Sequence, residues 1–412
     1  MTMYVQTLPW VANYDENEVP PFVLPEVLKS VDGAPIKDAA AWEANRPALL
    51  EQFRKVMYGA RLPLADKTEY TLLHEKKDAL DGAAVMRQIE LKFSMNNGRS
   101  HKAVMLLYIP AGATAEKPAP VFTGLTFNGN HVVSDDPDII VTGTAGEEFR
   151  SFDRTPGAQS RRFPLKEMMA RNFALAICSY HDFFPDAMEG WKKSILPLFI
   201  PDEEFEPRPR NISAISVWAW GLSRMLDCLE TIPEVDSTKA AVIGHSRLGK
   251  TALWAGAEDT RFKLVCVNDS GCGGAAPSRR LYGETLFCMC RQACNGFGHY
   301  WFTDTMHRDC EHPENFPIDQ HQLIALIAPR AVAVHSATED QWADPRGEYI
   351  SLQNASPVYA LYGKEILTAT EPPAPDTPVG TDMSYFLREG KHDLLPSDWA
   401  CYMNAFDHAL KG

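Results

Sequence analysis

The sequence lacks the features that would place it outside ordinary soluble proteins. It has no run near the roughly 18 to 20 apolar residues that a membrane-spanning helix needs, and Met1–Tyr14 lacks the basic and apolar parts of an export signal. No cysteine pair has the CxxC spacing of a zinc site, and nine cysteines are an odd number, which argues against a disulfide scaffold. Basic residues are also in deficit, with 40 Lys and Arg against 54 Asp and Glu. The resulting formal charge of -14 disfavours nucleic-acid and membrane partners.

The cysteines and the N-terminus set two further expectations. Cys288, Cys290 and Cys294 lie near Cys310 and His312, but their spacing fits no common metal pattern, so we expect buried or free thiols there. We expect no metal, no cofactor and a monomer. If a leader has been removed, the protein is secreted or periplasmic, and otherwise it is cytoplasmic.

The order of apolar segments predicts the architecture. Short apolar runs alternate with longer amphipathic ones, which is typical of a mostly parallel sheet covered by helices on both faces. A helix is expected over Ile212–Ile232, where Ile215, Trp218, Leu222 and later leucines recur at helical spacing. Strands are expected at Ala103–Ile109, Val121–Phe127, Ala174–Cys178, Ala240–Ile243, Leu264–Val267 and Ala331–His335, and a later apolar run lies at Met383–Leu387.

We find no internal repeat and no interior linker, so residues 1–412 are interpreted as one α/β domain. Residues 1–60 are rich in proline and predict an extended arm, followed by a helix near Trp42–Tyr58. Residues 277–320 are aromatic and irregular, and predict an insertion that builds or covers a site.

The segment Ala240–Trp254 reads as a strand, a tight turn and the start of a helix. In a nucleophile elbow such a turn exposes a serine hydroxyl above the sheet, close to backbone N–H groups that can hold an oxyanion. Gly244 stands two residues before Ser246, as the elbow requires, but Leu248 occupies the usual position of the second small residue. The elbow pattern is therefore met in part.

The same segment also matches a phosphate-binding loop. Gly244–Thr251 fits G-x-x-x-x-G-K-[ST] in full, and Asp269 ends a later strand where a magnesium ligand would stand. However, at least three predicted strands precede this loop, its interior holds His245 and Arg247, and the chain is acidic. The elbow is therefore favoured, with a nucleotide hydrolase as the alternative.

A serine nucleophile needs a histidine to take its proton and an acid to orient that histidine. In folds with such an elbow the order along the chain is serine, acid, histidine. His392 follows the apolar run Met383–Leu387 and precedes a helix beginning near Pro396, which is where the histidine loop of such a fold lies. Asp340 and Asp269 each follow a predicted strand, and either could be the acid.

Several segments together resemble the glucuronoyl esterases, carbohydrate esterase family fifteen. Gly244–Lys250 is similar to their nucleophile signature, with an arginine after the serine and a lysine four residues beyond it. Asp269–Gly274 is similar to the glycine-rich segment that carries the family's acid, twenty-three residues after the serine. His321–Arg330 and Asp340–Trp342 resemble two later segments, and the likeness runs from about Asn13 to the C-terminus.

The resemblance implies an α/β-hydrolase three-layer sandwich that cleaves glucuronoyl esters, such as the 4-O-methyl-glucuronate esters between xylan side chains and lignin alcohols. Ser246 would attack the C6 carbonyl, His392 would accept and return the proton, and a glucuronoyl-enzyme would form. Arg247 would stabilise the oxyanion. The partner would be a small-molecule or oligosaccharide uronate ester, with its hydroxyls and ring face held by Lys250, Glu284 and Trp342.

The chain departs from the family pattern in two places. Fungal members have a disulfide between cysteines beside the serine and the histidine, where this chain has His245 and Asp393, as in a bacterial-type branch. Asp269 stands where glutamate is usual, which shortens the reach by about 1.5 Å and leaves the choice between Asp269 and Asp340 open. Asp340 is slightly favoured as the orienting acid because it has the usual place at the end of the penultimate strand. A non-catalytic, uronate-binding relative of an esterase is a further alternative.

Overall fold

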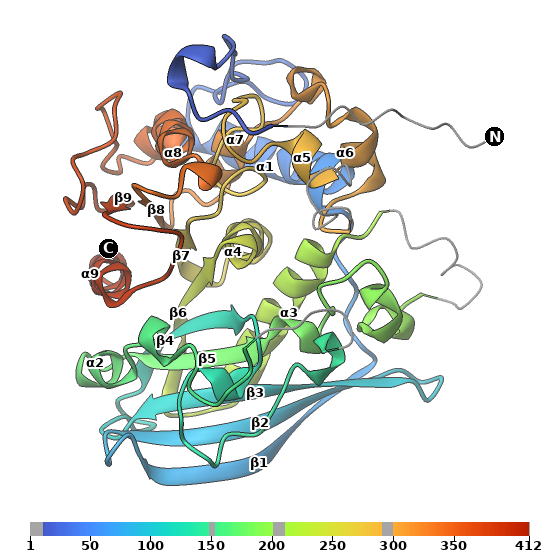
Figure 1. Ribbon diagram of the computed structural model, residues 1–412, viewed down its shortest axis with the longest axis vertical. Helices are drawn as coiled ribbons and strands as arrows, with labels where there is room; N and C mark the ends of the chain where they lie inside the picture. Colours follow the sequence, from blue (N-terminus) through green and yellow to red (C-terminus); the bar gives the residue numbers. More distant parts are fainter. Residues whose placement is uncertain (1–10, 148–152, 201–210, 291–299, 412) are drawn as a thin grey trace.

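The computed structural model describes residues 11–147, 153–200, 211–290 and 300–411. Its centre is a nine-stranded sheet with the order β1-β2-β3-β5-β4-β6-β7-β8-β9 (Figure 1). The pairs β1-β2, β2-β3 and β3-β5 are antiparallel. All later pairs in this order, from β5-β4 to β8-β9, are parallel, so the predicted mostly parallel sheet is confirmed. The strands are β1 (Lys67–Ala79), β2 (Ala84–Ser94), β3 (Ser100–Pro110), β4 (Ala119–Thr126), β5 (Ala174–Ser179), β6 (Val235–His245), β7 (Phe262–Asn268), β8 (Ala331–Ala337) and β9 (Met383–Arg388).

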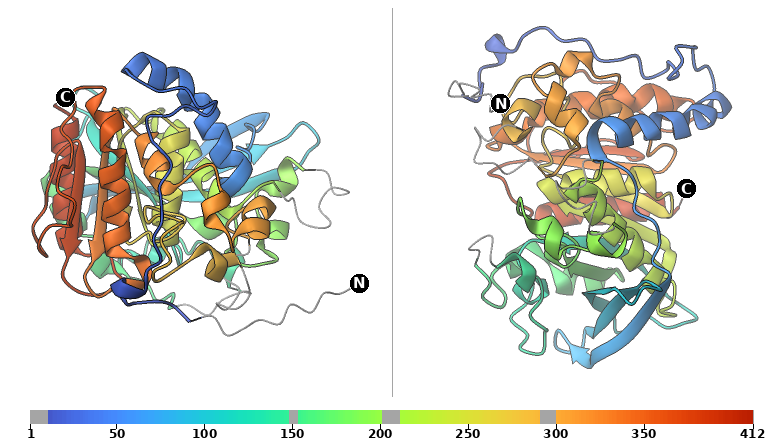
Figure 2. Two further views of the ribbon diagram at one scale, coloured as in Figure 1. Left: turned by 90° about the horizontal axis from the view of Figure 1, so that it is seen from above. Right: turned by 90° about the vertical axis from the view of Figure 1, so that its right-hand side faces the viewer.

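Hydrophobic cores fill both faces of this sheet. Successive residues of a strand point to opposite faces, so that Val121 belongs to the larger core and Phe122 to the smaller one. The smaller core is closed by α2 (Leu165–Ala170) and α9 (Pro396–Ala409). The larger core includes residues of α1 (Ala39–Phe53), α3 (Ala214–Leu229), α4 (Arg247–Glu258), α7 (Gln320–Ala325) and α8 (Pro345–Ala360). The result is the three-layer sandwich that the sequence predicted (Figure 2).

All six predicted strands are present, the later apolar run Met383–Leu387 is β9, and the helix predicted at Ile212–Ile232 is α3. The helix predicted at Trp42–Tyr58 is α1, which begins after Asp38 because that carboxylate accepts the N–H of Ala41. A π-helical turn continues it to Tyr58. β1 and β2 were not predicted. Within the described residues, no helix is long and apolar enough to span a membrane.

The N-terminal arm packs against the segment after β7, which was predicted as an insertion (Figure 2). The N–H of Gly283 donates to the carbonyl of Asn13 over 2.8 Å, and Arg280 is ion-paired with Glu16. This segment contains α5 (Leu286–Cys290) and α6 (Asp304–Asp309) before it reaches α7.

The parallel strands bring four loops to one edge of the sheet. Ser246 follows β6, Asp269 follows β7, Asp340 lies three residues after β8, and His392 lies four residues after β9. In open α/β sheets the crevice outside the carboxyl ends of the strands is where ligands bind. Residues far apart in the chain are therefore brought together there by the sheet order alone.

Candidate active site

Ser246 lies on a strained turn between β6 and α4. Its backbone has φ 59° and ψ -129°, a conformation that L-residues rarely adopt, and its N–H donates to the carbonyl of Asn268 over 2.8 Å. A Cβ at Gly244 would lie 1.8 Å from the carbonyl oxygen of Leu248, so this position requires glycine. At Gly249 a Cβ would lie 3.0 Å from the carbonyl oxygen of Asn268, a tight contact that favours glycine. The second small residue of the elbow therefore stands at 249 in this chain and not at the usual position, which Leu248 occupies. The geometry is that of a nucleophile elbow.

The same geometry excludes the phosphate-binding loop. The chain is helical from Arg247 onward, so no extended loop is available to wrap a phosphate. The Nζ atom of Lys250 donates to the carbonyls of Ser270 and Cys272 and to Glu284, at 2.7, 2.7 and 2.6 Å. The lysine is 2% exposed, and all three of its donors are used. The nucleotide-hydrolase alternative is therefore wrong.

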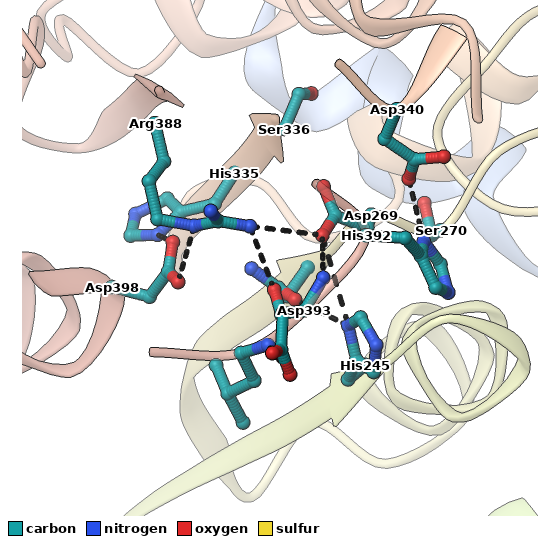
Figure 3. A network of polar contacts seen from close by, with 12 residues as sticks. His245, Asp269, Ser270, His335, Ser336, Asp340, Arg388, His392, Asp393 and Asp398 are labelled. Carbon is teal, nitrogen blue, oxygen red and sulfur yellow. Dashed lines mark hydrogen bonds and ion pairs between the residues drawn. The ribbon is translucent and has the colours of Figure 1, made fainter. Parts of the chain in front are cut away.

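His392 and Asp340 form the central polar contact of the site (Figure 3). The Nδ1 atom of His392 lies 2.5 Å from Oδ2 of Asp340. The carboxylate is buried, whereas the imidazole side chain is 40% exposed. With Nδ1 held by a carboxylate, Nε2 is left as the proton acceptor of the neutral ring.

Asp269 lies close to this pair but makes different contacts. Its Oδ2 accepts the N–H of Asp393 at 3.2 Å and lies 3.6 Å from the guanidinium of Arg388, while its Oδ1 has no hydrogen-bond partner within the described residues. Burial raises the pKa of this carboxyl well above its usual range, and the negative charge of Asp340 acts in the same direction. No hydrogen bond to His392 is recorded for it in the described structure. Asp340 is thus the carboxylate that touches the histidine.

Asp269, Asp340 and His392 are the three described residues whose ligand atoms lie close enough for a metal ion, all within 4.8 Å of one another. The 2.5 Å between Nδ1 and Oδ2 is too short for both atoms to be ligands of one ion. His392 and Asp340 are therefore better described as a hydrogen-bonded acid–base pair, with Asp269 as a neighbouring carboxylate. The expectation that the protein has no metal or cofactor stays a prediction.

Arg247 is the first residue of α4 and borders Ser246. Its guanidinium is ion-paired with the buried carboxylate of Asp186 and lies 4.7 Å from the ring centroid of Trp301. Burial lowers the pKa of the guanidinium, but the charge of Asp186 outweighs this effect and raises it. The Arg247 Nε atom is buried and has no hydrogen-bond partner among the described residues.

Glu284 and Trp342 are joined through the backbone. The N–H of Glu284 donates to the carbonyl of Trp342 over 2.8 Å. Gly283 has a positive φ of 56°, and a Cβ there would lie 2.4 Å from the carbonyl of Gln341. The glycine therefore lets the two segments approach and places Glu284 beside Lys250.

A cavity of about 290 Å3 brings most of the predicted site residues together. Of the predicted set, only Asp340 is not in its wall, since it lies behind His392. The insertion adds Cys288, Met289 and Trp301, so the predicted cover over the site is present, although those residues were not named from the sequence. The wall consists of Ser246, Arg247, Lys250, Asp269, Ser270, Glu284, Cys288, Met289, Trp301, Trp342, Ala343 and His392.

The cysteine prediction is correct for most thiols and wrong for one. Cys290 and Cys310 are buried, and five other described cysteines are free thiols, but Cys288 is disulfide-bonded. Whether two thiols can pair depends on a Cα separation below about 7 Å, which sequence spacing does not give. Cys294 lies outside the described residues.

The two positions that replace the fungal disulfide are held by other contacts. The His245 Nδ1 lies 2.5 Å from the side-chain oxygen of Asn268. Asp393 accepts Nε of Arg162 at 2.6 Å and is also paired with Arg161. The serine loop and the histidine loop are therefore fixed without a covalent bond between them.

The sheet, the elbow at Ser246 and the histidine–carboxylate contact on neighbouring loops define an α/β hydrolase. A family model described as glucuronyl esterase of fungi matches residues 207–363. A carbohydrate esterase, MZ0003, from an unknown prokaryotic organism is 38% identical over 410 residues, covering 97% of this chain and 92% of that protein. The solved glucuronoyl esterase of Solibacter usitatus is 37% identical with a TM-score of 0.88, covering 96% of this chain and 100% of that one.

The chain therefore belongs to the glucuronoyl esterases, carbohydrate esterase family fifteen, and is a carboxylic ester hydrolase. A fungal relative, 4-O-methyl-glucuronoyl methylesterase 1 of Wolfiporia cocos, is 35% identical over 155 residues, which are 37% of this chain and 38% of that protein. The predicted resemblance is confirmed, and of these three relatives the two that match over nearly the whole chain, at 38% and 37% identity, are the prokaryotic ones.

Proposed function

We propose that this protein hydrolyses esters of glucuronic acid through a glucuronoyl-enzyme on Ser246. The observation that carries the proposal is the 2.5 Å contact between His392 and Asp340 at a cavity that Ser246 and His392 both line. Together these supply a nucleophile on an elbow, a base beside it and an acid that fixes the tautomer of the base.

The proposed reaction begins with Ser246 Oγ attacking the C6 carbonyl carbon while His392 Nε2 takes its proton. The tetrahedral intermediate then collapses, and His392 returns the proton to the leaving alcohol. Water repeats the same steps on the glucuronoyl-enzyme, which releases glucuronate and restores the serine. Asp340 stays ionised and holds the imidazolium that forms in each half.

Negative charge develops on the carbonyl oxygen beside the first turn of α4. N–H groups in the first turn of a helix have no intrahelical acceptor, and the helix dipole favours an anion there. The backbone N–H of Arg247 is one of these groups, and its side chain supplies a guanidinium at the cavity wall. Both groups are proposed to stabilise the oxyanion.

The walls of the cavity suit one sugar unit. A volume of about 290 Å3 is at the small end of the range for ligand sites. Because every Nζ donor of Lys250 is used, the proposed role of this lysine is to hold Oε2 of Glu284, which leaves Oε1 to accept a sugar hydroxyl. Trp342 offers an apolar wall for the ring face.

The substrate class follows from the family and the cavity. Relatives are named 4-O-methyl-glucuronoyl methylesterases, so a methyl ester or a larger uronate ester is the proposed partner. His392 is 40% exposed, so an alcohol released beside it has access to solvent. This supports the proposal that the natural leaving group is a bulky one, such as a lignin alcohol joined to a xylan side chain.

The test compares hydrolysis of methyl and benzyl glucuronate with that of acetylated sugars. We expect the glucuronate esters to be preferred and Ser246→Ala to abolish turnover while the protein stays folded. A fluorophosphonate probe should label Ser246 and leave Ser270, which lines the same cavity, unlabelled. Uronate binding without any adduct would support the non-catalytic alternative, and a preference for acetyl esters would contradict the substrate class.

A further inference from the structure

We infer that Asp186 is a positioning residue that fixes the guanidinium of Arg247 against the cavity; this rests on the proposed function. Asp186 lies in the loop after β5 and does not line the cavity. It is 0% exposed, so an ionised carboxylate is placed here at a large desolvation cost. No sequence motif marks it.

Four donors from the described part of the chain converge on this one carboxylate. Oδ2 accepts the ion-paired Nη1 of Arg247 and the hydroxyl of Tyr180 at 2.8 Å. Oδ1 accepts the hydroxyl of Tyr300 at 2.5 Å and Nε1 of Trp301 at 2.8 Å. Because an ionised carboxylate only accepts hydrogen bonds, its two oxygens can serve all four donors at once.

The contacts fix the arginine on more than one side. Trp301, which Asp186 holds, lies under the guanidinium at 4.7 Å, and the ring of Phe127 lies 5.8 Å from it. Asp186 therefore fixes both the cation and an aromatic ring that flanks it. A guanidinium is a planar group whose hydrogen bonds have fixed directions, so such a clamp determines where its remaining N–H groups point.

One of these N–H groups has no use in the structure as it stands. The Arg247 Nε atom is buried and has no hydrogen-bond partner in the described part of the chain. A buried donor without a partner is costly, and a native protein that keeps one needs a reason for it. The remainder of the guanidinium is not fully enclosed: the Arg247 side chain lines the cavity and is 21% exposed, so the group that Asp186 clamps borders the space where the carbonyl oxygen gains charge.

The main test is Asp186→Asn, assayed on benzyl glucuronate. The amide nitrogen presents hydrogens to groups that are themselves donors, so at least one of the four contacts is lost. We expect kcat to fall by about 10-fold to 100-fold, less than the roughly 100-fold to 1,000-fold for loss of an oxyanion donor. KM should change by less than about threefold, because the oxyanion exists only in the transition state.

A double-mutant cycle separates positioning from a general structural role. In an Arg247→Met background the Asp186→Asn change should lower kcat no further, because it acts through the arginine. The matched control is Asp182→Asn, another carboxylate of this loop, whose Oδ1 accepts the N–H of Gly143 over 2.8 Å and whose recorded contacts do not include Arg247. This control should keep its kcat.

Two outcomes would overturn the inference: an unchanged kcat in Asp186→Asn, or an equal further loss in the Arg247→Met background. If Asp186→Asn does not fold, Tyr300→Phe decides, because it removes one of the four donors and should lower kcat severalfold at constant KM. Failure here is distinct from failure of the proposed function, since Ser246→Ala would still be inactive.

Discussion

The loops after β7 and β8 each bring a buried aspartate to the same histidine, and the two aspartates are held in opposite ways. Asp340 makes a direct contact of 2.5 Å with His392. Asp269 faces the backbone of the histidine loop and the guanidinium of Arg388, and one of its oxygens has no partner (Figure 3). Both aspartates therefore lie near the histidine, but Asp340 is the one that is hydrogen-bonded to it.

The difference shows that two carboxylates near one base can do separate work. Asp340 can stabilise positive charge on the imidazole because it is hydrogen-bonded to it. Burial raises the pKa of Asp269, so its neutral form is favoured, and the contact it makes supports the loop rather than the ring. On this view Asp340 acts on the chemistry and Asp269 acts on the position of the histidine loop.

The largest effect is expected from Asp340→Asn, which should lower kcat by about 1,000-fold or more. An amide can donate to Nδ1 as well as accept from it, which admits the tautomer with its proton on Nε2, and this tautomer cannot take the serine proton. Steady-state kinetics on benzyl glucuronate measure the loss, and a thermal melt shows that the fold is kept. A greater loss in Asp269→Asn would reverse the comparison.

The second-largest effect is expected at Arg388, whose guanidinium lies 3.6 Å from Asp269 and supports the histidine loop. Arg388 donates to the carbonyls of Lys391 and Asp393, on either side of His392, and to Asp398 at 3.0 Å. A lysine cannot make these contacts together, so Arg388→Lys should misplace the histidine and lower kcat by about 100-fold. The free energy of unfolding should fall by about 1 to 3 kcal/mol, because the hydrogen bonds that the buried guanidinium makes to Asp398 and to the two carbonyls are not all replaced.

Arg330→Lys is the matched control for this change. Arg330 also donates to backbone carbonyls, those of Gly256, Asp259 and Phe262, none of which lies in the histidine loop. We expect this variant to lose stability but to keep its kcat per folded molecule. If both variants kept full kcat, Arg388 would have only a structural role.

How far the sequence predicts this molecule depends on which residues carry the signal. Strands β3 to β9 are found because buried strands are apolar runs. β1 is missed because only one of its residues is buried and many are polar, such as Lys67, Glu75 and Lys76. β2 is missed because polar side chains are interspersed through it. Tertiary pairing, which the sequence does not display, makes these segments strands.

The candidate site shows the same limit. Ser246 and His392 are found because the turn chemistry and the chain order are written in the sequence. The choice between Asp340 and Asp269 stayed open because spacing along a chain does not give distances between loops. Asp186 was missed altogether, since its partners Tyr300 and Trp301 are more than a hundred residues away.

A third, smaller effect is expected from Asp269→Asn. The amide oxygen can still accept the N–H of Asp393, and it resembles the neutral carboxyl that burial favours. We expect kcat to fall by about tenfold or less, the size of one ordinary hydrogen bond. Because the pKa of Asp269 is raised, the wild type becomes more like the variant as pH falls, so the difference in kcat should shrink toward acid pH. A difference that grows toward acid pH would contradict this assignment.

The smallest effect is expected from Asp393→Asn, at the ion pair that stands in place of the fungal disulfide. Burial raises the pKa of Asp393, but Arg162 and Arg161 outweigh it and hold it below its usual value. The ion pair therefore contributes its full stability at pH values above the usual pKa of an aspartate, and this contribution is lost as the pH falls through the lowered pKa of Asp393. We expect about 1 kcal/mol less unfolding free energy at neutral pH, a smaller difference in 1 M salt, and a kcat within about threefold.

Asp407→Asn is the control for this prediction, because Asp407 is paired with Arg171 at 2.5 Å, outside the histidine loop. Its loss should cost a similar free energy and leave kcat unchanged. Urea unfolding at two salt concentrations measures how much each ion pair contributes to the free energy of unfolding. Steady-state kinetics shows whether only the loss of the Asp393 pair changes kcat. If kcat fell by a hundredfold in Asp393→Asn, the ion pair would matter as much as Arg388, and the loop would depend on its surface contact as much as on the buried one.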